Sequence, residues 1–187
     1  MEIYLVRHTR VDVAPGICYG QSDVSCSATF AEEAPRVRQK LGNGNGIIVY
    51  SSPLQRCVGL AEKLADHVKT DPRLMELHFG DWEMQLWSEL EGPYLQQWMQ
   101  DFVNVACPNG ESYVDLSQRS QAFLWEKTET YADETLVLVT HGGVIRAMVS
   151  HVLGLPLENS FRLEFDYGSV SLISITKGAG KVEFLNR

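Results

Sequence analysis

Three short apolar runs constrain the fold of this 187-residue chain more than any other feature. The runs at 3–6, 47–50 and 136–139 are rich in leucine and β-branched residues, with little alternation of polar and apolar side chains. This composition is typical of strands that are covered on both faces, as in parallel sheets. Helical patterns separate the runs, at residues 29–41, 53–67, 112–131 and 144–153. We therefore predict an α/β fold of three layers, α/β/α, with a mostly parallel sheet and an antiparallel edge strand.

Signals at the helix ends support these boundaries. Ser27 is the predicted N-cap of the first helix, and Pro53 occupies the favoured first position of the second. Ser112 and Asp115 come close to a capping box, and Gly154 follows the last helix as a stop signal.

The remaining segments are less regular. Residues 170–175 alternate apolar residues with serine, which predicts a half-exposed strand. Residues 182–185 form a further predicted strand after a glycine-rich turn at 178–180, and residues 84–104 indicate an irregular helix. No repeat divides the sequence, and its length suits a single domain over residues 1–187.

Bulk composition narrows the functional classes. The chain is 44% hydrophobic and 21% charged, as expected of a globular protein. A formal net charge of −8 argues against general binding to nucleic acid or to a membrane surface. The apolar runs are too short to span a membrane, and no signal peptide is expected at the N-terminus. Four cysteines without a C-x-x-C pair indicate free thiols rather than disulfides or a zinc site, so we expect a cytoplasmic protein.

Polar clusters follow the three apolar runs, at the point where each predicted strand ends. Arg7 and His8 follow the first run, Ser52 and Arg56 the second, and His141 the third. The carboxyl ends of parallel strands meet at one edge of a sheet, where ligands bind in α/β folds. Helix N-termini and arginine forks both favour anions. Taken singly, each cluster is better explained as structure, but three at equivalent positions predict a phosphate site that contains an imidazole.

Glu76 opens a further distinctive stretch, ELHFGDWE. Alone, the stretch is better explained as an acidic surface loop with a packed aromatic anchor. Beside a phosphate site, the carboxyl group of Glu76 can serve as a general acid.

These motifs together resemble the histidine phosphatase superfamily, the phosphoglycerate mutase-like enzymes. The matching stretches keep the order of the family: LVRHT at 5–9, SSPLQRC at 51–57, ELHFGDWE at 76–83, PNGES at 108–112 and VTHGG at 139–143. Within the superfamily, GICYGQSDV at 16–24 and RHT in place of the commoner RHG look most like the α-ribazole phosphatase branch.

The resemblance implies a role for each residue of the clusters. His8 is the expected nucleophile, and the nearby cations Arg7 and Arg56 favour the neutral imidazole that attack requires. The two arginines and His141 hold the phosphoryl oxygens, with His141 best suited as an imidazolium beside a bound dianion. Glu76 protonates the leaving oxygen and then acts as base for water. No metal or other cofactor is implied, because arginines neutralise the phosphoryl charge.

Other positions have weaker assignments. Arg10 is either a further phosphate contact or a solvated charge. Four aromatic residues, Trp82, Trp87, Tyr94 and Trp98, can form the wall of a pocket for an aromatic base, but packed helix surface is the favoured role for most of them. The expected substrate-binding residues are Thr9, Tyr19, Gly20 and Gly142.

The expected function is hydrolysis of a small phosphorylated metabolite, with α-ribazole 5′-phosphate of cobalamin synthesis as the leading substrate. Alternatives are a phosphoglycerate mutase-type transferase, a broad-specificity phosphatase and a non-catalytic protein that binds phosphorylated ligands. The short chain lacks an arginine-rich insertion after Glu76, which favours hydrolysis over the mutase. The sequence leaves open the oligomeric state and whether the 11–23 loop closes over substrate.

Overall fold

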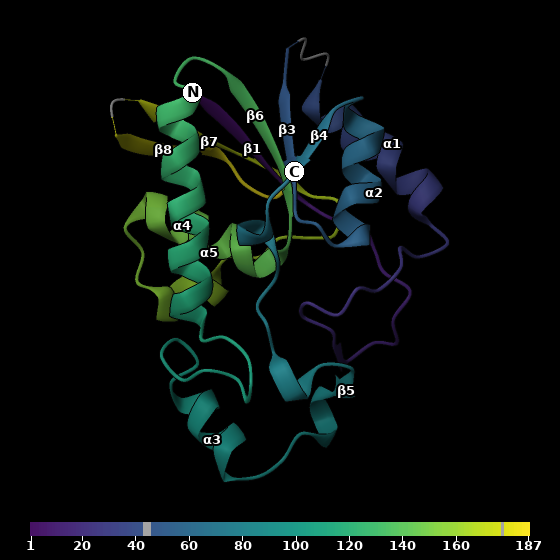
Figure 1. Ribbon diagram of the computed structural model, residues 1–187, viewed down its shortest axis with the longest axis vertical. Helices are drawn as coiled ribbons and strands as arrows, with labels where there is room; N and C mark the ends of the chain where they lie inside the picture. Colours follow the sequence, from purple (N-terminus) through teal and green to yellow (C-terminus); the bar gives the residue numbers. More distant parts are fainter. Residues whose placement is uncertain (43–45, 177) are drawn as a thin grey trace.

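A six-stranded mixed sheet forms the centre of the computed structural model, which describes residues 1–42, 46–176 and 178–187. The strand order is β4-β3-β6-β1-β7-β8. The first four strands in this order pair in parallel, and β7 and β8 add antiparallel pairings beside β1 (Figure 1). The strand bounds are β1 Glu2–Arg7, β3 Ile48–Ser51, β4 Val68–Thr70, β6 Thr135–Thr140, β7 Val170–Thr176 and β8 Ala179–Phe184. The predicted α/β fold with a mostly parallel sheet is confirmed.

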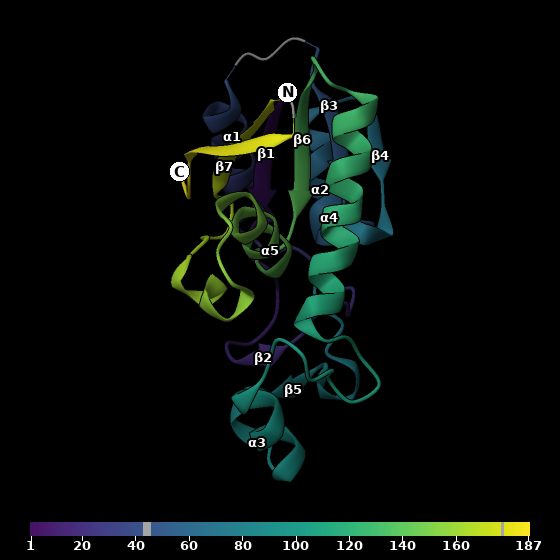
Figure 2. The same ribbon diagram turned by 90° about the vertical axis from the view of Figure 1, so that its left-hand side faces the viewer.

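Helices cover both faces of this sheet (Figure 2). Helices α1 (Phe30–Leu41) and α2 (Gln55–Leu64) pack on one face, and α4 (Tyr113–Thr130) and α5 (Gly142–Leu153) pack on the other. Strand β6 shows why its apolar run has no polar alternation. Val137 points into the core beneath α1 and α2, whereas Leu136 and Leu138 point into the core beneath α4 and α5.

A smaller group of elements extends past the carboxyl ends of the central strands, at the bottom of Figures 1 and 2. It contains a two-stranded sheet, β2 (Ile17–Cys18) with β5 (Gln85–Leu86), and helix α3 (Pro93–Gln100). Short 3-10 helices lie at Pro72–Leu74, Gly80–Trp82, Trp87–Glu89 and Leu157–Arg162. The prediction of irregular helix over 84–104 is therefore correct only for α3.

Three predicted helix starts are wrong. Helix α5 begins at Gly142, two residues before the predicted start at 144. Helix α2 begins at Gln55 rather than Pro53 and ends at Leu64, because Leu54 has an extended backbone and the chain then turns into β4. Helix α1 begins at Phe30, and Ser27 lies outside it, where its hydroxyl accepts a hydrogen bond from the Thr29 amide. The capping box of Ser112 is confirmed, as is the helix end at Gly154, which has a left-handed backbone.

The last two strands also differ from the prediction. Strand β7 is mostly buried rather than half-exposed, because β1 and β8 flank it and helices cover its faces. Ser171 is fully buried there, and its hydroxyl accepts a hydrogen bond from the Asn186 amide. Strand β8 begins at Ala179, so most of the predicted glycine-rich turn belongs to a strand.

Within the ranges that the structure describes, no helix is long and apolar enough to cross a membrane.

Candidate active site

The ends of β1, β3 and β6 bring the three predicted polar clusters together. The amide of His8 donates to the Thr140 carbonyl, and the amide of Ser52 donates to the Val139 carbonyl, so pairing in the sheet fixes both positions. The rings of His8 and His141 lie with their centroids 5.1 Å apart. A strand-end histidine and its neighbours therefore occupy one edge of the sheet, as the parallel topology requires.

The ring of His8 is buried and has a fixed orientation. Its Nδ1 lies 2.7 Å from the Thr9 carbonyl oxygen, which can only accept, so Nδ1 carries the proton and Nε2 keeps the lone pair. Burial lowers the pKa of His8 well below its usual value, and the charges of Arg56 and Arg7 lower it further. The sequence interpretation also expected a lowered pKa for His8, but burial rather than the arginines is the largest cause of the shift.

Two arginines approach this histidine from different elements. Arg56 is fully buried in the first turn of α2, and its guanidinium donates to the carbonyls of Ser22 at 2.9 Å and Gly20 at 2.6 Å. Arg7 donates to the Phe165 carbonyl and packs its guanidinium over a tyrosine ring. The Nε atoms of both arginines are buried and have no hydrogen-bond partner in the described part of the chain. Buried donors of this kind suit an anion such as phosphate.

His141 lies at the start of α5 and is also fully buried. Its Nε2 lies 2.8 Å from the Ser52 hydroxyl and 3.5 Å from the Cys57 sulfur. Burial lowers the pKa of His141, followed by the charges of His8 and Arg56. These surroundings favour a neutral imidazole. The sequence interpretation expected an imidazolium beside a bound dianion, because the negative charge of the dianion raises the pKa of a nearby imidazole.

Glu76 reaches the start of the same helix. Its carboxylate accepts hydrogen bonds from the amide of Gly143 at 3.1 Å and from the amide of Leu77 at 2.9 Å. The preceding residue, Gly142, lies beside the Arg7 guanidinium, whose Cζ would be in ordinary contact, at 3.5 Å, with a Cβ at that position. The carboxylate therefore lies at the rim of the arginine and histidine cluster, at a helix N-terminus that favours anions.

The backbone around Glu76 is held by a clamp that the sequence interpretation missed. Arg119 of α4 forms an ion pair with Glu111 at 2.8 Å, and its guanidinium donates to the carbonyls of Arg73, Met75 and Glu76. Glu111 also accepts from the amide of His78. Glu111 belongs to the segment PNGES at 108–112, one of the stretches that resemble the superfamily. An arginine 43 residues from Glu76 in the chain gives no local signal of the contact.

The predicted substrate-binding residues line the cluster. Thr9 is buried, and its carbonyl orients His8. Gly20 has a positive φ of 37° and supplies a carbonyl to Arg56; a Cβ there would lie only 2.7 Å from the Leu77 carbonyl oxygen. Tyr19 packs its ring near Arg56, and its hydroxyl lies 2.8 Å from that of Tyr167.

Tyr167 is a site residue that sequence reasoning missed. Its ring centroid lies 5.5 Å from that of His8 and 3.9 Å from the Arg7 guanidinium carbon. It precedes β7, which the antiparallel pairing with β1 brings beside the cluster, and no motif around it predicts this position.

Arg10 lies on the surface, whereas two of the tryptophans line a cavity at the site. Arg10 forms an ion pair with Glu33 at 2.7 Å, and its side chain is 65% exposed, which supports a solvated charge. Trp87 and Trp98 line a cavity beside Glu76, as the alternative interpretation of a pocket wall expects, whereas Trp82 is buried. Among the described residues, no group of three or more His, Cys, Asp and Glu side chains is placed to hold a metal ion.

Comparison with known proteins agrees with this geometry. The family model for the histidine phosphatase superfamily (branch 1) matches residues 3–187. The chain belongs to this superfamily.

Individual relatives of this histidine phosphatase have different names. The Adenosylcobalamin/alpha-ribazole phosphatase of Escherichia coli (strain K12) is 27% identical over 195 residues, covering 100% of this chain and 96% of the relative. "Probable phosphoglycerate mutase GpmB" of Yersinia pestis (strain Pestoides F) is 33% identical over 183 residues, covering 92% and 84%. The crystal structure of the alpha-ribazole phosphatase from Shigella flexneri superposes with a TM-score of 0.92 at 26% identity, covering 100% and 96%. The chain is an enzyme, a phosphatase of the histidine type.

Proposed function

We propose that this phosphatase hydrolyses a phosphomonoester through a phosphohistidine on His8, and that its substrate is α-ribazole 5′-phosphate. One observation carries the mechanism. The buried His8 has a tautomer that keeps the lone pair on Nε2, and the charges of Arg7 and Arg56, whose buried Nε donors have no partner within the described residues, act on its ring. A neutral nucleophile beside a cationic cradle is what attack on a phosphate requires.

The first step forms the Nε2–P bond of His8 as the bond from phosphorus to the leaving oxygen breaks. Arg7, Arg56 and His141 hold the equatorial oxygens, where charge spreads in the transition state. Because Arg56 and His141 are fully buried and the backbone of Arg7 pairs with β6, these groups are fixed before substrate arrives and reorganise little during the reaction.

Glu76 supplies the proton for the leaving oxygen in this step. In the second step its carboxylate takes a proton from water as the water oxygen attacks phosphorus and the Nε2–P bond breaks. The products are inorganic phosphate, an alcohol and the free imidazole of His8. Thr9, Tyr19, Gly20 and Gly142 complete the walls of the site.

The substrate assignment has a separate basis. The segment 16–24 and the RHT motif are similar to the α-ribazole phosphatase branch, and a relative and a neighbouring structure have that name. With it we propose a role in cobalamin synthesis, a cytoplasmic location and a single domain over 1–187. The mutase name of another relative makes phosphoryl transfer the competing activity.

The test is release of inorganic phosphate in the presence of a chelator. The panel contains α-ribazole 5′-phosphate, nucleotides and phosphoglycerates, with wild type, His8→Ala and the exposed-histidine control His67→Ala. We expect release that persists with chelator, is greatest for α-ribazole 5′-phosphate, survives in His67→Ala and disappears in His8→Ala. Equal activity of wild type and His8→Ala would refute the nucleophile, and isomerisation of phosphoglycerate without phosphate release would favour the mutase.

A further inference from the structure

A cavity of about 320 Å³ opens beside the Glu76 carboxylate and Gly143. Its walls are aromatic, formed by Phe79, Trp87, Trp98, Phe102, Tyr113 and Phe161. The volume lies at the lower end of the range for cavities that hold a small organic ligand, on the order of 300–1,000 Å³. Because Glu76 lies on its wall, whatever fills the cavity lies next to the proposed proton donor for the leaving oxygen.

The aromatic rings of the cavity are arranged around an open space rather than packed shut. Trp87 and Trp98 stack with an interplanar angle of 25°, and the ring of Phe79 meets Trp87 edge-on at 87°. On the other side, Phe161 meets Phe102 edge-on at 80°. Trp87 is 38% exposed and Phe161 is 58% exposed, so part of each ring is accessible to water when the cavity is empty. A flat apolar group removes that surface from water and adds ring contacts.

Arg146 is the one cation that lines this cavity in the described part of the chain. Its Nε donates to the Leu163 carbonyl at 3.0 Å, and its guanidinium lies over the ring of Phe161. It lies one helical turn after Gly142, and its NH1 would be 3.3 Å from a Cβ at that glycine, where Arg7 also approaches. The guanidinium therefore stands between the phosphate cluster and the aromatic walls. The terminal nitrogens of Arg146 suit an oxygen acceptor that lies between a ring and a phosphoester.

We infer, on the basis of the proposed function, that this cavity binds the leaving group and selects a flat aromatic ring joined to the phosphate through an oxygen-bearing segment. The aromatic walls stack on the ring, and Arg146 donates to hydroxyl oxygens of the connecting segment. The substrate class is an aryl-glycoside phosphate of nucleotide shape. Small polar alcohols such as serine or glycerate leave the aromatic walls in water and are poor substrates.

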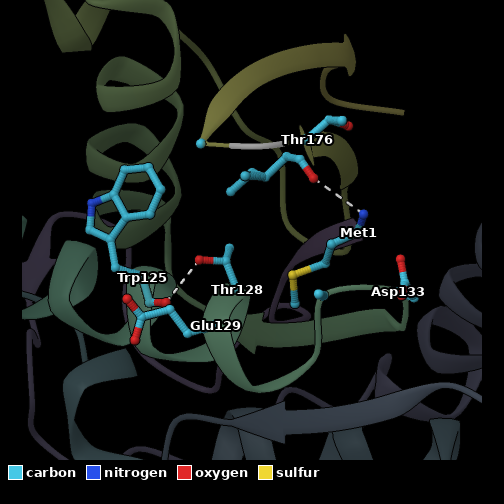
Figure 3. Close-up of a pocket in the computed structure, with 9 residues that line it drawn as sticks. Met1, Trp125, Thr128, Glu129, Asp133 and Thr176 are labelled. Carbon is cyan, nitrogen blue, oxygen red and sulfur yellow. Dashed lines mark hydrogen bonds between the residues drawn. The ribbon is translucent and has the colours of Figure 1, made fainter.

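The test compares kcat/KM for α-ribazole 5′-phosphate, which has ring and sugar, with ribose 5-phosphate, which lacks the ring. Trp87→Ala and Phe161→Ala remove exposed parts of the wall, and Trp125→Ala is the matched control. Trp125 is also 38% exposed, but it lines a different cavity beside Met1 and Thr176 (Figure 3). Met1 precedes β1 (Glu2–Arg7) and His8 follows it, so this cavity lies at the other end of the strand.

We expect Trp87→Ala and Phe161→Ala to lower kcat/KM for α-ribazole 5′-phosphate about 10-fold, mainly through KM, because ring stacking contributes about that much. In the same two variants, kcat/KM for ribose 5-phosphate should change less than about twofold. In Trp125→Ala, kcat/KM for both substrates should also change less than about twofold. Arg146→Met should lower kcat/KM about 10-fold for both sugar phosphates but spare p-nitrophenyl phosphate, which has no sugar oxygens. Equal losses on α-ribazole 5′-phosphate and ribose 5-phosphate in the wall variants would overturn the inference.

Binding of α-ribazole itself, measured by tryptophan fluorescence, separates this inference from the proposed chemistry. The dephosphorylated compound fills the cavity whether or not His8 reacts. A Kd that rises about 10-fold in Phe161→Ala and is unchanged in Trp125→Ala supports the cavity even if the phosphohistidine is refuted. A Kd that is the same in wild type and Phe161→Ala overturns the cavity assignment even if His8 is the nucleophile.

Discussion

Replacing Gly143 with alanine adds a methyl group at the point where Glu76 meets helix α5. A Cβ built on Gly143 overlaps Oε1 of Glu76, whose Oε2 accepts the Gly143 amide proton. Van der Waals contact between carbon and oxygen needs about 3.5 Å, so the carboxylate has to move by about 1 Å. The obstacle is the end of a flexible side chain, so the helix itself can form around the new methyl group.

The substitution should therefore separate stability from activity. Alanine in place of a helical glycine contributes up to about 1 kcal/mol to the free energy of unfolding. A displacement of about 1 Å at the proton donor costs on the order of 100-fold in kcat. We expect Gly143→Ala to be at least as stable as wild type, with kcat on an alkyl phosphate lowered about 100-fold.

The assay compares urea unfolding with turnover of two substrates. Because Glu76 also acts in hydrolysis of the phosphohistidine, the substrates are compared in the first step alone, as the burst of released alcohol or nitrophenol in a single turnover. An alkyl phosphate needs a proton for its leaving oxygen, whereas p-nitrophenolate departs without one, so the burst rate with p-nitrophenyl phosphate should fall less than about fivefold. Gly59→Ala in α2 is the matched control, because its Cβ would meet only Phe30 at 3.9 Å. Equal losses in the burst rate of both substrates, or an undiminished burst with the alkyl phosphate, would refute the role of Glu76 as proton donor.

Two further predictions follow from buried groups. Because burial lowers the pKa of both His8 and His141, the unfolded chain binds more protons below about pH 6.5. The contribution of these two histidines to the free energy of unfolding should be constant above that pH and fall below it by up to about 1.4 kcal/mol per pH unit for each histidine. Urea titrations of His8→Asn should therefore show a smaller slope below about pH 6.5 than wild type. Arg119→Met should lower kcat on alkyl phosphates about 10-fold, because it loosens the backbone at Glu76. Arg73→Met is the control, because it breaks ion pairs with other carboxylates and should lower only the free energy of unfolding. A kcat that falls equally in both variants would contradict the role of Arg119 in positioning Glu76.

The sequence was sufficient for the strands that lie in the middle of the sheet. Strands β1, β3 and β6 are buried on both faces, so their apolar runs are continuous and easy to locate. Strand β4 reads VKT and lies half-exposed at the sheet edge, where pairing with β3 rather than side-chain burial defines it. No local pattern predicts such a strand. The helix predicted over 53–67 therefore runs three residues past the true end of α2, up to the start of β4.

The site divides in the same way. The cluster around His8, Arg56 and His141 was predictable because parallel strands deliver their ends to one edge. Tyr167 and Arg119 reach the site through long-range packing, which no spacing in the sequence encodes. Arg146 is different, because its position one helical turn after Gly142 is a signal that places both on one face of α5.

The most direct test of this account is the covalent state of His8 during turnover. The enzyme is mixed with p-nitrophenyl phosphate, quenched in alkali, digested and analysed by mass spectrometry, for wild type and for Glu76→Gln. The account predicts phosphate on the peptide that contains His8, with more of it in Glu76→Gln because that variant cannot activate water to hydrolyse the intermediate. A burst of nitrophenol with no phosphate on His8, or phosphate on another residue, would contradict the central claim.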